Sequence, residues 1–146
     1  ENYILPIGKA SKVIEAELKY EKSGESVVII TYGRGVYWSL EASRSFAGQI
    51  EILDLRTLSP LDEDQILKSV KKHGKSLIVT EEPSSASFSL GIAGFIQENC
   101  FEFLDAPVKI IGSENTPAIP LNENLEFTYL PNASKVQKAI STLLDY

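Results

Sequence analysis

Residues 50–80 read IEILDLRTLSPLDEDQILKSVKKHGKSLIVT and contain the clearest strand-helix-strand pattern in the chain. The apolar runs 50–54 and 77–80 predict buried strands. Between them, segment 59–73 predicts a helix that begins with Ser-Pro, carries acidic residues in its first turn and ends in lysines, His73 and a glycine. Because a helix dipole favours this order of charges, we expect His73 to be a cation at the helix end and not a catalytic base.

Predicted strands and helices also lie before and after this strand-helix-strand segment. The sequence predicts strands at 27–31 and 108–111, helices at 36–47 and 88–100, a last helix after Asn132, and an extra edge strand at 8–13. Alternating strands and helices favour an α/β fold with a mainly parallel sheet and helices on both faces. Segment 112–131 is too rich in proline and asparagine for regular structure, and a loop of this length commonly has a function or covers an interface.

Composition excludes several classes of protein. The 146 residues have 14 Lys and Arg against 20 Asp and Glu, a net charge of −6 that does not suit a nucleic-acid binder. No apolar run reaches the roughly 18 residues of a membrane span. One His and one Cys exclude a His/Cys metal cluster. The chain contains no Met, so we expect residues 1–146 to be one domain cut from a longer polypeptide.

The turn Gly33-Arg34-Gly35 is a candidate nucleotide site. It follows a predicted strand, and Asp54 ends the next strand 21 positions beyond Gly33, as in a dinucleotide fingerprint. The third glycine of that fingerprint, which lets the pyrophosphate approach the helix, is replaced by Trp38. We therefore interpret the two glycines as a tight turn between strand and helix.

Adjacent carboxylates, Glu81 and Glu82, follow a predicted strand at the edge where such sheets bind ligands. Paired carboxylates can act as acid and base or hold Mg²⁺, but neighbours on a strand point in opposite directions, which favours solvated or interface acids. The serines in 84–89 are expected to cap the following helix, and Cys100 is expected to be a core residue. An alternative to an enzyme domain is a free-standing binding or regulatory module of the same fold. Such a module would bind a small anion near Gly33, Glu81 and Glu82.

Three longer motifs resemble a known family. LPIGKA at 5–10, ILDLRTLSPLD at 52–62 and FLDAP at 103–107 are similar to the transketolase C-terminal domain. The likeness covers nearly the whole chain and is greatest to the beta subunit, or beta half, of the thiamine-diphosphate-dependent decarboxylase of 2-oxoacid dehydrogenase complexes, of the pyruvate or 2-oxoisovalerate type. Shorter matches are Thr31-Tyr32-Gly33, Glu82-Pro83, Gly112-Ser113, Thr116-Pro117 and Leu130-Pro131.

The resemblance implies a three-layer α/β/α fold with a doubly wound, mostly parallel sheet of about five strands, one of them an antiparallel edge strand. It implies an oxidoreductase acting on an oxo group with a disulfide acceptor, whose thiamine diphosphate and Mg²⁺ are bound by other domains, so this part alone would be inactive. The implied partners are the other domains and subunits of the decarboxylase and the subunit-binding domain of the acyltransferase core. The implied location is the bacterial cytoplasm, or an organelle matrix.

From the residues and the resemblance together we expect an interface and no catalytic, cofactor-binding or metal-binding residue in this chain. The candidate interface residues are Glu81, Glu82, Gly112, Asn115, Thr116, Pro117, Asp145 and Tyr146. Asn115 departs from the family pattern, which commonly has Asp there. Another thiamine enzyme with the same kind of C-terminal domain, such as transketolase or deoxyxylulose-phosphate synthase, is a further alternative.

Overall fold

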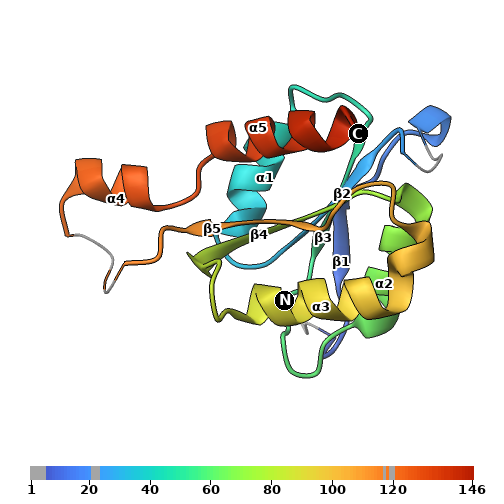
Figure 1. The fold of residues 1–146 in the computed structure, drawn as a ribbon, viewed down its shortest axis with the longest axis horizontal. Helices are drawn as coiled ribbons and strands as arrows, with labels where there is room; N and C mark the ends of the chain where they lie inside the picture. The colour runs from blue at the N-terminus through green and yellow to red at the C-terminus, as the bar shows by residue number, and fades with distance from the viewer. Residues whose placement is uncertain (1–5, 21–23, 117, 119–120) are drawn as a thin grey trace, which may run out of the picture.

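A mixed β-sheet forms the middle layer of the molecule (Figure 1). The computed structural model describes residues 6–20, 24–116, 118 and 121–146. Among these residues the sheet has five strands, in the order β1-β3-β2-β4-β5, with β1 antiparallel to β3 and the other pairs parallel. The strands are β1 (Ser11–Ile14), β2 (Val27–Thr31), β3 (Ile50–Asp54), β4 (Ser76–Pro83) and β5 (Lys109–Ser113).

Helices cover both faces of this sheet, which confirms the expected three-layer α/β/α fold. They are α1 (Gly35–Ser43), α2 (Glu63–His73), α3 (Phe88–Cys100), α4 (Glu123–Tyr129) and α5 (Ala133–Leu144), with short 3₁₀ turns η1 (Leu18–Tyr20) and η2 (Phe101–Phe103). Helices α1 and α5 lie on one face, and α2 and α3 on the other.

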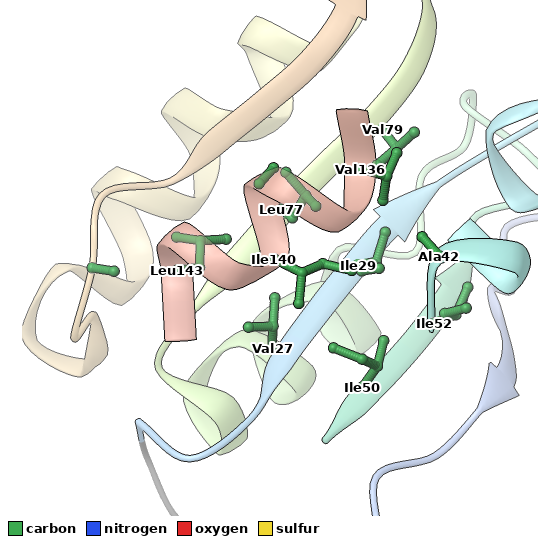
Figure 2. Close-up of a cluster of buried hydrophobic side chains, with 12 residues drawn as sticks. Val27, Ile29, Ala42, Ile50, Ile52, Leu77, Val79, Val136, Ile140 and Leu143 are labelled. Carbon is green, nitrogen blue, oxygen red and sulfur yellow. The ribbon is translucent and has the colours of Figure 1, made fainter. Parts of the chain in front are cut away.

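Two apolar cores result from the alternation of side chains along the strands. Figure 2 shows the core under α5, where Val27 and Ile29 of β2 and Leu77 of β4 face Ile140 of α5. The intervening residues Val28, Ile30 and Ile78 point to the other face and pack with Ile66 of α2 and Ile92 and Ile96 of α3. Full burial on both faces explains why these strands read as continuous apolar runs.

Several predicted boundaries are correct, because their signals are local. Strands 27–31 and 50–54 and helix 88–100 have the expected bounds. The last helix starts after Asn132, whose side chain accepts the N–H of Lys135 at 3.0 Å. Helix α1, in contrast, ends at Ser43 and not at residue 47.

Two predicted starts were wrong, both because of one long-range cluster. The edge strand begins at Ser11 and not at Gly8, since Gly8 donates its N–H to Thr57 Oγ1 at 2.9 Å and Ala10 donates its N–H to Asp62 Oδ2 at 2.9 Å. Helix α2 begins at Glu63, not at residue 59, because Asp62 is the capping residue.

The expectation that segment 112–131 lacks regular structure was also wrong. Helix α4 forms within it because Asn122 caps the helix, accepting the N–H groups of Asn124 and Leu125 at 3.1 and 3.3 Å. Its far end is fixed by Glu114, which donates its N–H to the carbonyl of Tyr129 at 3.2 Å. The segment therefore contains the end of β5 and a regular helix, and α4 projects from the body of the molecule (Figure 1).

Candidate functional site

The parallel strands all end at one edge of the sheet, which we call the carboxyl edge. Strands β2 and β4 are neighbours there, but the chain leaves them toward helices on opposite faces, α1 and α3. Such a switch point is where open α/β sheets place ligands. Glu81 and Glu82 lie near the end of β4, while Asn115 and Thr116 follow β5. The carboxyl edge thus collects these sequence-predicted interface residues, and Pro117 lies outside the described residues.

Hydrogen bonds within the chain close the switch point. Tyr32, after β2, donates its hydroxyl to Glu82 Oε1 at 2.5 Å, and Thr80 Oγ1 donates to Tyr32 Oη at 2.9 Å. Burial and the neighbouring Glu82 carboxylate raise the pKa of Tyr32 to about 12. Glu82 Oε1 also accepts the N–H of Ser89 in the first turn of α3, at 3.2 Å. The chain's own carboxylate therefore occupies the helix N-terminus where a bound anion would sit.

The two glycines of the turn 33–35 act structurally, as the sequence predicts. Gly33 has φ +58°, and a Cβ on Gly35 would overlap Thr31 Oγ1 and lie 2.8 Å from the carbonyl oxygen of Val79. Gly112 has a similar role, since its Cβ would lie 2.5 Å from the carbonyl oxygen of Glu82. The positive φ of Gly33 and the close packing at Gly35 and Gly112 thus explain these glycines without a ligand.

A groove runs between α1 and α4, beside the carboxyl edge. Its volume is about 670 Å³, and its lining includes Arg34, Trp38, Glu41, Glu123, Phe127 and Pro131. Arg34 lies over the Trp38 ring, 5.5 Å from its centroid, and Arg34 Nη1 is 3.8 Å from Glu126 Oε1. We call this hollow the α1–α4 groove; it combines aromatic walls with carboxylates but brings together no nucleophile and base.

Large apolar side chains are exposed on α1, on α4 and just before α4, and one of them, Phe127, lines the α1–α4 groove. Leu121, Leu125 and Phe127 are 104%, 57% and 69% exposed, and Tyr37 on α1 is 72% exposed. Lys135 Nζ of α5 holds the base of α4 by donating to the carbonyls of Thr128 and Leu130 at 2.7 and 3.0 Å. Clustered apolar exposure on a well-anchored element is typical of a surface that meets another protein.

Asp145 and Tyr146, the last two candidate interface residues, lie at the opposite edge of the sheet. They follow α5, whose last turn is tied to the start of β4 because Lys75 Nζ donates to the carbonyl of Leu144 at 3.2 Å. Both residues are exposed. The structure therefore divides the predicted interface residues between two separate surfaces.

A buried polar cluster around Glu51 was missed by the sequence reasoning. His73 lies in the last turn of α2, as expected, but it and Glu51 are both fully buried, so His73 also belongs to a cluster inside the protein. His73 Nε2 lies 3.2 Å from Glu51 Oε2, Ser69 Oγ donates to Glu51 Oε1 at 2.5 Å, and Lys12 Nζ lies 3.3 Å from Glu51 Oε2. The signal in the sequence is a single glutamate inside an apolar strand.

The charges in this cluster determine its proton positions. Burial alone would raise the pKa of Glu51, but hydrogen bonds from His73 and Ser69 and the charges of His73 and Lys12 outweigh it and lower the pKa to about 2. An ionised carboxylate only accepts hydrogen bonds, so His73 Nε2 carries a hydrogen. His73 Nδ1 lies 2.5 Å from Ser26 Oγ. Because both imidazole nitrogens are bonded inside the protein, the cluster holds elements together and is not a catalytic site.

The remaining sequence candidates have structural roles. Ser87 caps α3, accepting the N–H of Leu90 at 3.3 Å, as expected for the serine-rich loop. Cys100 is buried in the core under α2 and α3, and burial raises the pKa of its thiol. In the ranges that the structure describes, no three or more His, Cys, Asp or Glu side chains are grouped to hold a metal ion. Nor does any helix in those ranges have the length and apolar character needed to cross a membrane.

Comparison with known proteins identifies the family. Residues 16–136 match the family described as "Transketolase, C-terminal domain". The chain belongs to this family. The match confirms the resemblance, and the described segments of its motifs lie in this fold at the β1 start, the β3–α2 connection and the η2–β5 connection.

Three relatives show which kinds of protein contain such a domain. The chain is 33% identical to the 2-oxoisovalerate dehydrogenase subunit beta of Bacillus subtilis over all of its length and 43% of that protein. It is 31% identical to the pyruvate dehydrogenase E1 component subunit beta of Rhizobium meliloti, over 98% of this chain and 30% of that one. It is 34% identical to the acetoin:2,6-dichlorophenolindophenol oxidoreductase subunit beta of Bacillus subtilis, over 97% of this chain and 40% of that protein.

A solved structure agrees with the fold. A split gene transketolase, an inactive beta4 tetramer, superposes with a TM-score of 0.76 over 97% of this chain and 44% of that chain, at 19% identity. This likeness concerns the fold alone. In all four comparisons the chain spans less than half of the related protein.

Proposed function

We propose that this chain is the C-terminal assembly and partner-docking domain of a thiamine-diphosphate-dependent 2-oxoacid dehydrogenase, in the component that decarboxylates the 2-oxoacid and acylates lipoamide. The beta subunits of pyruvate and 2-oxoisovalerate dehydrogenase among its relatives support this class. The observation that carries the docking role is the exposed apolar surface of α4 beside the α1–α4 groove. Decarboxylation would then take place on other parts of the enzyme.

The residues that the structure describes do not fit thiamine diphosphate and Mg²⁺. A diphosphate needs a free helix N-terminus or cationic cradle, whereas Glu82 occupies the first turn of α3 and Gly35 packs against β4. A Mg²⁺ site needs several oxygen ligands together, and the described segments contain no cluster of three acidic or other metal-binding side chains. We therefore place the cofactor in other domains and derive no catalytic step from this one.

The two surfaces suit two kinds of partner in this proposal. The carboxyl edge with α4 would contact the other domains and subunits of the decarboxylase, because it offers a large apolar area. The exposed residues Asp145 and Tyr146 would meet the basic subunit-binding domain of the acyltransferase core, because Asp145 offers a carboxylate. Their separation lets both contacts exist at once.

The alternative of a small-anion module has less support. Its expected site near Gly33 and Glu82 is closed by the Tyr32–Glu82 hydrogen bond, and a second negative charge beside Glu82 would be repelled. The alternative of a transketolase shares this fold, but its structural match is only 19% identical. The relatives above 30% identity are dehydrogenase or oxidoreductase beta subunits.

Two measurements test the proposal. In calorimetry, titration of thiamine diphosphate with Mg²⁺ into residues 1–146 should give no saturable heat; binding at micromolar concentration would show that the cofactor site is here. In the complete enzyme, the double variant Leu125→Asp/Phe127→Asp should prevent subunit assembly while leaving the fold intact, since both side chains are exposed. Normal assembly of this variant in analytical ultracentrifugation would contradict the docking role of α4.

A further inference from the structure

Arg56 adopts a backbone conformation that its side chain disfavours. It has φ +58°, directly after β3 at the carboxyl edge. The turn is a tight one, in which Thr57 donates its N–H to the carbonyl of Leu55 at 2.6 Å and Arg56 donates its own N–H to Asp54 Oδ1 at 3.1 Å. Residues other than glycine rarely occupy this region, and such strain persists where the surroundings impose it.

The surroundings fix this turn from both sides. Leu55 is buried and donates its N–H to the carbonyl of Thr31 at 2.9 Å. Thr57 Oγ1 donates to the carbonyl of Pro60 at 3.0 Å and accepts the N–H of Gly8 at 2.9 Å. The turn therefore fixes the backbone at Arg56, and the side chain of this residue is exposed.

No residue in the described part of the chain binds the guanidinium of Arg56. It has no ion pair, side-chain hydrogen bond or ring contact there, and it does not line the α1–α4 groove. Glycine would fit the turn without strain. The described chain thus shows an exposed arginine on a fixed, strained turn, with no partner of its own.

The same edge holds a second strained residue, Ala86, which follows β4 and has φ +52°. Gly33, after β2, has φ +58°, which glycine adopts without strain. Three neighbouring parallel strands are therefore each followed by a left-handed residue at one edge. Strained conformations of this kind concentrate where a surface is preorganised for binding.

We propose that Arg56 is a docking residue that binds a carboxylate side chain of the subunit packed against the carboxyl edge in the assembled enzyme. This inference rests on the proposed function. A guanidinium is a planar fork of donors that matches a carboxylate in two parallel hydrogen bonds. A protein carboxylate fits better than a free anion, because a single exposed arginine side chain outside any groove binds an isolated ion weakly. A protein surface supplies further contacts around its carboxylate.

The test uses the complete enzyme with variants that separate charge from strain. Arg56→Gly removes both the guanidinium and the strain. Ala86→Gly relieves strain of the same kind without changing charge. Arg44→Gln removes an exposed arginine that ends α1 with φ −58°, an ordinary helical value. Assembly is measured as a subunit dissociation constant by analytical ultracentrifugation at several salt concentrations.

We expect Arg56→Gly to raise the dissociation constant at least tenfold and to reduce its dependence on salt. Ala86→Gly and Arg44→Gln should each change it less than twofold, and Arg56→Lys should give an intermediate value. An unchanged dissociation constant for Arg56→Gly overturns the inference. If the α4 double variant still prevents assembly in that case, the proposed function stands; if neither variant affects assembly, both fail.

A second measurement separates the two sources of anion. Inorganic phosphate is added to residues 1–146, and the melting temperature is followed for the wild type and Arg56→Gly. We expect phosphate to shift both proteins equally. A shift confined to the wild type would show that Arg56 belongs to a site for a free anion, and it would overturn the assignment to a subunit carboxylate.

Discussion

His73 Nε2 donates its hydrogen to Glu51 Oε2 across 3.2 Å, and both side chains are completely buried. The pair joins α2 to β3, and Lys12 extends it to the edge strand β1. Three elements therefore meet at one carboxylate. A buried ion of this kind is tolerated only while its partners are present, because removal of one partner leaves an uncompensated charge in the core.

Replacement of the carboxylate should be costly. We expect Glu51→Gln to lower the free energy of unfolding by about 3 kcal/mol, since His73 and Lys12 lose their anion. Urea denaturation measures this change. Glu15→Gln is the matched control, because Glu15 Oε1 also lies near Lys12 Nζ, at 3.7 Å, but is exposed. A surface pair contributes less than about 1 kcal/mol, so equal losses in the two variants would contradict the role of the buried cluster.

The pH dependence of stability should report the same carboxylate. The pKa of Glu51 lies at about 2, below its ordinary value of 4.5. The stabilisation from its ionised form is thus fully present above pH 4.5 and is lost as the pH falls toward 2. We expect unfolding free energy to fall more steeply between pH 5 and 2 in the wild type than in Glu51→Gln. Parallel curves would show that Glu51 is not the group responsible.

The hydroxyl of Tyr32 should be detectable by titration. We expect Tyr32→Phe to lose about 2 kcal/mol, because its hydrogen bond reaches the charged Glu82. In ultraviolet absorbance, the wild type should show a phenolate step near pH 12 that Tyr32→Phe lacks. The stabilisation linked to this raised pKa is present below pH 10 and is lost as the pH rises toward 12. Tyr37→Phe, at a side chain 72% exposed, should change stability by less than about 0.5 kcal/mol.

Two glycine substitutions should have opposite effects. Gly35→Ala places a methyl group against Thr31 Oγ1 and the Val79 carbonyl, so we expect a loss of about 1–3 kcal/mol. Gly94→Ala places the same group in open space on the surface of α3, where a gain of roughly 1 kcal/mol is expected from helix propensity. Thermal unfolding compares the two variants, and a loss in both would show that α3 needs its glycine for another reason.

The sequence predicted those elements whose signals lie within them. Strand 27–31 is an unbroken apolar run, and helix 88–100 starts at a capping serine, so both were found at their true bounds. Helix α4 was missed because proline and asparagine around it obscure the single local signal, the Asn122 cap. The edge strand was misplaced because residues 8 and 10 bond to a loop 49 and 52 positions away.

The candidate site shows the same division between local and distant information. That Glu81 and Glu82 lie at the carboxyl edge follows from their place after a strand of a mainly parallel sheet, which local patterns predict. That Glu82 bonds to Tyr32, 50 positions earlier, depends on β2 and β4 being neighbours. The pairing of Glu51 with His73 likewise depends on where α2 crosses β3, which the spacing of residues along the chain does not reveal.

The position of α5 has a consequence for how the protein is made. Ala133–Leu144 supplies the side chains that cover Val27, Ile29 and Leu77 on one face of the sheet (Figure 2). Synthesis runs from the N-terminus, so all five strands leave the ribosome before their cover does. Until those twelve residues emerge, the nascent chain presents an apolar sheet face that α1 covers only in part, and it is then a natural substrate for chaperones that bind exposed hydrophobic segments.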